Sequence, residues 1–390
     1  MLGRHLVTPL LAAVARRGDG RRPRGPFGPR LSTIARRTLT VIALGLALAV
    51  LAVHAARNPW GPDEDALRAG ELMTRGLKEL GRMRAEIGEP IDPKLDPAGS
   101  GLIGVEYSDI TTSLGDLVAK QTSLNPAFAG LVVRWLKEAE VHAGDRVAVT
   151  FSGSFPALNL AVLCAIETLR LDARVISSVG ASMYGANIYG FTWLDMEKRL
   201  AEAGIVHTRS RWASLGGIAD THGGVFETGI VEGEAAIART GTPYLREGTP
   251  ATVERDALRR MDLYFEDGPP RAYVNVGGNV TAIGWINETH ALEGGLARHL
   301  TPTDAPKRGL LHRMAEKGVP VIHMLNIERL AAANHLPIAP RVLVYDIDFR
   351  AAHRSHLLRL FGLLALWFAF AAVMGSFAAR DPGTFDPWRR

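Results

Sequence analysis

Two long apolar runs without charged residues, one near each end of the chain, constrain this sequence most. The first runs from Thr38 to Ala56, with His54 as its only ionisable residue, and the second runs from Leu360 to Ala379. A helix of this length extends roughly 28 Å, close to the hydrocarbon thickness of a bilayer. Its backbone bonds are satisfied internally, so it can cross lipid. The sequence therefore predicts two transmembrane helices, at residues 38–56 and 357–379.

Arginine placement predicts the orientation of these helices. Residues 1–37 carry nine arginines and one acid, Asp19, whereas the far side of the first run soon becomes acidic at Asp63, Glu64 and Asp65. The positive-inside rule then makes residues 1–37 a basic cytoplasmic arm and 380–390 a cytoplasmic tail. The main domain is expected on the extracytoplasmic side of the inner, or cytoplasmic, membrane. A cleaved signal peptide ending near Ala56 is the alternative for the first run, although the leader is unusually long for one.

The net charge is divided unevenly along the chain. Of the formal +5, the arm contributes +8, and Arg57, Arg359 and the tail together contribute +3, which leaves about −6 for residues 58–358. Binding to a nucleic-acid backbone depends on many Lys and Arg side chains. Nucleic acid is therefore not an expected partner. With 390 residues, 47% of them hydrophobic, the chain has enough apolar material for a sizeable core.

The residues between the two runs divide into a stalk and a domain. Apolar residues at helical spacing predict a helix from Asp63 to Ile87, and a linker rich in Pro, Gly and Asp follows from Glu89 to Gly101. Residues 57–101 are therefore expected to form a juxtamembrane helix and linker. Residues 102–356 are expected to form the extracytoplasmic domain.

Short apolar strands alternate with helices within this domain. Such alternation predicts an α/β fold with a doubly wound, mostly parallel, Rossmann-like sheet covered by helices on both faces. A capping box at Thr192 and Asp195 marks one helix start, and Gly204 marks its end. The predicted strands are Arg146–Phe151, Arg174–Ser177, Ile205–Thr208, Ala272–Val276 and Val319–His323, and the predicted helices are Ala157–Leu169, Trp193–Ala203, Val253–Phe265 and Lys307–Lys317.

Three small, polar loops follow predicted strands. Ligands of open α/β sheets lie beyond the carboxyl ends of the strands, where the amino ends of helices also point. Pro156, at a plausible first helical position, would leave the N–H groups of the first loop free for a carboxylate or phosphate. Either the loops form one binding site, or their small residues only make tight turns and caps. The candidate ligand-binding residues are Ser152 and Gly153 in the first loop, Ser178 and Ser182 in the second, and Gly277, Gly278 and Asn279 in the third.

A glycine-rich segment from Ser214 to Gly224 carries an Asp and a His. Ser154 as nucleophile, His222 as base, and Asp220 or Glu227 as orienting group would make a hydrolase triad. The G-x-S-x-G elbow that often accompanies such triads does not occur. Asp220 and His222 stand without a second cluster at ligand spacing, so no metal is expected.

Nucleotide-binding motifs do not occur in the sequence. Neither G-x-x-x-x-G-K-[ST] nor G-x-G-x-x-G is present, so no cofactor is expected and ATP-driven ligation is not indicated. The single cysteine, Cys164, lies in an apolar run and is expected to be a buried small side chain rather than a reactive thiol.

Four strings of this sequence resemble a known bacterial family, the poly-gamma-glutamate system proteins. They are FSGSFPALNLAVLCAIETL (151–169), VISSVGASMYGAN (175–187), SLGGIADTHGG (214–224) and YVNVGGNVTAIG (273–284), held between two terminal spans. The resemblance extends from the first span to the second. It implies a role in making or exporting a γ-linked glutamate polymer of the capsule or cell envelope. It carries over no catalytic residue.

Three hypotheses follow for the function. In the first, the chain is a membrane-anchored accessory component of poly-gamma-glutamate biosynthesis or export, which binds glutamate-type carboxylates at the strand-end loops. In the second, it is an extracytoplasmic serine hydrolase or transferase that acts on the polymer. In the third, it is a structural subunit that assembles other membrane subunits of the synthesis machinery. The expected partners are accordingly glutamate or its polymer, those subunits, and the membrane.

Overall fold

The computed structural model describes residues 63–217, 226–246, 252–284, 294–300 and 308–342, together with Leu44, Gly45 and Ala47. The chain divides into two units, residues 1–58 and 59–390, and the second is described below. Three residues of the first apolar run are helical, while its remainder and the whole run from 360 to 379 lie outside the described residues. None of the described helices combines the length and the apolar character that a membrane crossing needs.

A six-stranded sheet forms the centre of the described domain, in the order β5-β3-β2-β6-β8-β7. Neighbouring strands are parallel except β7, which runs antiparallel to β8. The prediction of an α/β fold with a mostly parallel sheet is confirmed. The chain places β3 and β5 on one side of β2, and then β6 and β8 on the other, which is a doubly wound order. The strands are β2 (Arg146–Ser152), β3 (Asp172–Ser178), β5 (Trp212–Ser214), β6 (Ala272–Val276), β7 (Gly295–Ala297) and β8 (Val321–Met324).

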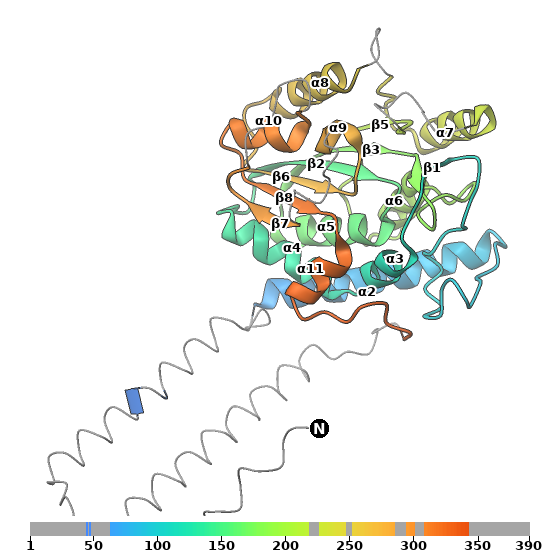
Figure 1. The fold of residues 1–390 in the computed structure, drawn as a ribbon, viewed down its shortest axis with the longest axis horizontal. Helices are drawn as coiled ribbons and strands as arrows, with labels where there is room; N and C mark the ends of the chain where they lie inside the picture. The colour runs from blue at the N-terminus through green and yellow to red at the C-terminus, as the bar shows by residue number, and fades with distance from the viewer. Residues whose placement is uncertain are drawn as a thin grey trace, which may run out of the picture. The chain divides into compact units, whose positions relative to one another are not determined.

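Helices cover both faces of the sheet (Figure 1). One face packs against α4 (Ala127–Glu138), α5 (Pro156–Leu169) and α6 (Trp193–Glu202), with α7 (Glu227–Thr240) beside α6. The other face packs against α8 (Val253–Phe265), α9 (Val280–Ile283) and α10 (Leu310–Glu316). Because both faces are buried, the central strands read as nearly continuous apolar runs, which is why the sequence reveals them.

The helix predicted from Asp63 to Ile87 is present as α2 (Glu64–Glu86) and packs across α4 and α5. Asp63 caps it, accepting a hydrogen bond from the N–H of Asp65 at 3.0 Å. Its inner face buries Met73, Leu77 and Leu80 completely. The apolar spacing of this segment therefore belongs to a helix that forms part of the domain core.

Two predicted strands need correction. Residues Ile205–Thr208 are not a strand: the N–H groups of Ile205 and Val206 close the end of α6 on Leu200 O, and Thr208 N–H donates to Glu167 at 2.8 Å. The edge strand comes later, as β5. The last predicted parallel strand is shifted, since β8 begins at Val321 and ends at Met324.

Several short elements have no counterpart in the predictions. A two-stranded parallel pair joins β1 (Thr111–Ser113) to β4 (Ala181–Ser182). The short helices α3 (Leu117–Ser123) and α11 (Ile327–Ala333) pack against each other. All four lie at the carboxyl-end edge of the large sheet, where they enclose the site described next.

Candidate functional site

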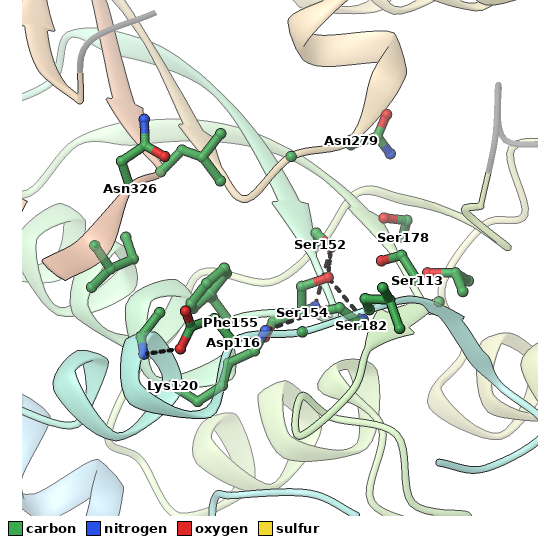
Figure 2. A pocket seen from close by; sticks show the side chains of 18 of the residues that line it. Ser113, Asp116, Lys120, Ser152, Ser154, Phe155, Ser178, Ser182, Asn279 and Asn326 are labelled. Carbon is green, nitrogen blue, oxygen red and sulfur yellow. Dashed lines mark hydrogen bonds between the residues drawn. The ribbon is translucent and has the colours of Figure 1, made fainter. Parts of the chain in front are cut away.

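A cavity of about 600 Å³ opens beyond the carboxyl ends of the central strands. It lies where the strand order changes direction, between β2 and β6, which is the usual ligand position in a doubly wound sheet. The three predicted loops converge on it (Figure 2). Residues from those loops that line it are Ser152, Ser154, Ser178, Gly180, Ser182, Gly278 and Asn279.

The first loop turns sharply from β2 into α5. Ser152 Oγ accepts the N–H of Ser154 at 3.1 Å and donates to Ser154 Oγ at 2.9 Å. A Cβ on Gly153 would lie 2.5 Å from the carbonyl oxygen of Val179, so only glycine lets the two loops approach this closely. Pro156 begins α5, and the capping position, Phe155, supplies no side-chain acceptor. The positive end of a 14-residue helix therefore faces this loop.

The second loop is joined to the first through Ser154. The N–H of Ser182 donates to Ser154 Oγ at 3.0 Å. Ser178 Oγ donates to the carbonyl oxygen of Phe151 at 3.3 Å. Ser154 Oγ thus accepts two hydrogen bonds, from Ser152 and from Ser182, which leaves its own proton for the cavity.

The third loop is held from inside the sheet. Asn275 Nδ2 donates to the carbonyl oxygen of Gly277 at 2.8 Å and also contacts His323 Nδ1 at 3.0 Å. Burial lowers the pKa of His323 to about 4, so the imidazole is neutral at pH 7 and Nδ1 can accept. Gly277 has φ +89°, a conformation that favours glycine. This buried pair fixes the path that leads Gly278 and Asn279 into the cavity.

Lys120 of α3 lines the cavity and is absent from the predicted site residues. Its side chain is buried, and Nζ donates to the carbonyl oxygen of Ser154. Nζ also lies 2.7 Å from Ser182 Oγ and 3.7 Å from the centre of the Phe155 ring. Burial lowers the pKa of this amine to about 7, although the charge of Asp116 opposes the shift.

Other polar groups line the cavity around this cluster. Asp116 and Glu328 supply carboxylates, and Arg329 supplies a guanidinium. Within the described part of the chain, the backbone N–H groups of Phe155 and Gly278 have no hydrogen-bond acceptor. The cavity therefore offers hydroxyls, unused N–H donors and groups of both charge signs, a set that suits a small ligand carrying both a carboxylate and an amine.

The predicted triad is described only in part. Ser154 lies in the cavity, while Asp220 and His222 lie outside the described residues. Glu227 is the exposed first residue of α7 and does not line the cavity. Cys164 is fully buried on α5, and burial raises the pKa of its thiol. Among the described residues, His, Cys, Asp and Glu side chains nowhere gather in threes at metal-binding distance.

A sequence signal for Lys120 does exist. Asp116 is followed by Leu-Val-Ala-Lys-Gln-Thr-Ser, in which the lysine is the only charged residue. Asp116 caps this helix, accepting the N–H of Ala119 at 3.1 Å. A lysine that a short capped helix turns inward must find acceptors or lose its charge.

Comparison with known proteins identifies no match to this chain. No protein-family model, curated protein or solved structure matches this chain.

Proposed function

We propose that this chain is a membrane-anchored accessory component of poly-gamma-glutamate biosynthesis or export, and that its strand-end cavity binds an end of the γ-linked glutamate chain. The observation that carries the proposal is the convergence of three polar loops, Lys120 and the amino end of α5 on one cavity. The anchoring rests on the uncharged runs at 38–56 and 360–379. The polymer class rests on the resemblance of the four sequence strings.

The end of a γ-linked chain has chemistry that matches the cavity. At its amino end, the terminal residue carries a free α-amine and an α-carboxylate close together. The start of α5 and the N–H of Gly278 suit the carboxylate. Asp116 and Glu328 suit the ammonium. This local match is needed because residues 58–358 carry about −6 and repel a polyanion at long range.

Binding is tested with two variants at one position. A Cβ on Gly278 would meet only Leu325 Cδ1, at 3.7 Å, so a side chain fits there. Gly278→Asp adds a charge to the cavity wall, and Gly278→Asn adds the same volume without charge. Like charges about 6 Å apart at an effective dielectric constant of about 20–40 repel by ~1–3 kcal/mol. We therefore expect the Asp variant to bind roughly ten- to hundredfold more weakly than the Asn variant.

The measurement is calorimetric titration of the full chain in detergent with short γ-linked glutamate oligomers, with α-linked oligomers as the control ligand. Preference for γ-linked oligomers together with an Asp-specific loss supports the proposal. If the unmodified chain gives no heat with either oligomer, the proposed binding function is wrong. A purely structural role in subunit assembly is then favoured.

A hydrolase or transferase acting on the polymer is the second candidate function. The contact between Lys120 Nζ and Ser182 Oγ favours it, because an amine beside a hydroxyl is the arrangement that activates serine in Ser–Lys enzymes.

A further inference from the structure

The hydrogen bonds around Lys120 Nζ leave one direction for its lone pair. A neutral amine has two N–H donors and one lone pair. The carbonyl oxygen of Ser154 can only accept, so it takes one N–H. The face of the Phe155 ring, 3.7 Å away at its centre, attracts the other. Nζ lies 2.7 Å from Ser182 Oγ and donates to it when charged; in the neutral amine the lone pair can face this oxygen instead and accept its proton.

The surroundings keep this amine neutral for a large part of the time at pH 7. Lys120 is 2% exposed and, within the described residues, forms no ion pair. Asp116 on its own helix favours the charged form, and Glu328 and Arg329 of α11 line the same cavity with opposite charges. Burial outweighs Asp116, and the pKa of Lys120 falls to about 7. An amine with this pKa can serve as a base at neutral pH.

Ser182 is positioned to use that base. It lines the cavity and is 6% exposed, and β4, to which it belongs, is held by pairing with β1. Its own N–H is taken up by Ser154 Oγ. The donors near it that remain for a developing negative charge are the Ser154 hydroxyl and the N–H of Phe155.

We propose that Ser182 is the nucleophile and Lys120 the general base of an acyl-transfer centre acting on an amide. The substrate class rests on the proposed function: the amide is a γ-glutamyl bond near the end of the polymer. Ser154, the nucleophile of the predicted triad, instead donates a hydrogen bond to the carbonyl oxygen of the substrate in this centre. Figure 2 shows Ser182, Ser154 and Lys120 together on one side of the cavity.

The reaction balances with water as the second substrate. Ser182 Oγ bonds to the carbonyl carbon, its proton passes to Lys120 Nζ, and the carbonyl π electrons move to oxygen. When that oxyanion collapses, the C–N bond breaks and Lys120 gives its proton to the leaving amine. Water then attacks the ester on Ser182, loses a proton to Lys120, and releases the γ-carboxyl group as the proton returns to Ser182. An amine in place of water makes the reaction a transfer.

A fluorophosphonate probe tests the nucleophile directly, since it phosphonylates an activated serine with loss of fluoride. We expect the full chain in detergent to be labelled at Ser182, as located by peptide mass spectrometry. The labelling rate should rise with pH to a plateau, with a midpoint near 7, because only neutral Lys120 is a base. Labelling at Ser154 instead, at no serine, or with no such pH dependence overturns the assignment.

Variants separate the base from a structural role. General-base assistance contributes about 10²–10⁴-fold, so Lys120→Met should slow labelling by at least about a hundredfold. Lys120→Arg keeps a cation but has no base at this pH, and it should be equally slow. Val118 on the same helix is 38% exposed and lies outside the cavity lining, so Val118→Ala should label normally. A Lys120→Arg chain that folds and labels at the normal rate contradicts the proposal. If the Lys120 variants do not fold, the pH dependence of labelling in the unmodified chain still tests it.

γ-Glutamyl-p-nitroanilide separates this inference from the function on which it rests. Release of nitroaniline that is lost in Ser182→Ala supports both. Labelling of Ser182 without turnover of the anilide or binding of γ-linked oligomers supports the Ser182–Lys120 pair and contradicts the γ-glutamyl assignment. Oligomer binding without labelling or turnover contradicts the pair and leaves the binding function standing.

Discussion

At the scale of single residues, the domain buries two ionisable groups with opposite effects on stability. Lys120 is a base whose pKa is lowered to about 7, whereas Glu197 on α6 is an acid whose pKa burial raises to about 7. Glu197 is fully buried and accepts the N–H and the hydroxyl of Ser210, each at 2.8 Å. Both groups lose charge readily near neutral pH, but only Lys120 lines the cavity.

The raised pKa of Glu197 makes the free energy of unfolding depend on pH. Between its ordinary pKa of 4.5 and about 7, the folded chain holds a proton that the unfolded chain has lost. The free energy of unfolding therefore falls as pH rises through this window, by up to about 1.4 kcal/mol per pH unit. Glu197→Gln mimics the protonated acid and keeps a partner for each group of Ser210. We expect urea unfolding at pH 5, 6 and 7 to show a flatter profile for the variant; parallel profiles would mean that Glu197 is charged throughout.

Local sequence pattern identifies two of the three residues of this centre, the serines, and does not identify the lysine. Ser154 and Ser182 stand out because each lies in a small, polar loop directly after an apolar strand. Lys120 lies upstream of the first predicted strand, on a helix of seven residues, and only tertiary packing brings it beneath Ser154 and Ser182. The contact between Lys120 and Ser182 joins residues 62 positions apart, so the spacing of residues along the chain cannot predict it.

At the scale of elements, the turn from β6 to α9 provides a matched pair of glycines. Gly277 has φ +89°, and a Cβ there would lie 3.2 Å from the Cβ of Ser152. Gly278 meets nothing closer than 3.7 Å and has no positive φ. We expect Gly277→Ala to lower the free energy of unfolding by about 1–2 kcal/mol, the cost of a left-handed backbone for a residue with a Cβ. Gly278→Ala should change it by less than about 0.5 kcal/mol in urea unfolding. Equal losses of stability in the two variants would show that the cost comes from crowding in the turn and not from the positive φ of Gly277.

How well an element is predicted follows its length and its burial. The helix Val253–Phe265 and the strand Ala272–Val276 have the predicted bounds, because a capping threonine sets the helix start and every residue of the strand is buried. β1 and β4 have three and two residues, too few for any periodicity, and exist only because they pair with each other. The sequence therefore predicts the sheet and its strand-end loops, while the short elements that close the cavity depend on tertiary packing.

At the scale of the whole molecule, the distribution of charge and the cavity are linked through the expected orientation. Residues 58–358 have a net charge of about −6, and the arm, residues 1–37, has a net charge of +8. In the expected orientation lipid separates the two, and the arm faces anionic lipid on the cytoplasmic side. The polymer would meet only the acidic side. Selective contact with a chain end, rather than coating by the polyanion, is the behaviour that such a surface favours.

The orientation can be tested because the chain has one cysteine and that cysteine is buried. Cys164 is 0% exposed and burial raises the pKa of its thiol, so a maleimide should scarcely react with the folded chain. Val231 on α7 is 64% exposed, and Val231→Cys therefore places a reporter on the domain surface. Ser32→Cys places a matched reporter in the basic arm.

With a membrane-impermeant maleimide on intact spheroplasts, we expect Val231→Cys to be labelled and Ser32→Cys to be labelled only after permeabilisation. The reverse pattern would put the cavity in the cytosol, away from any exported polymer, and would remove the basis for its assignment to the cell envelope.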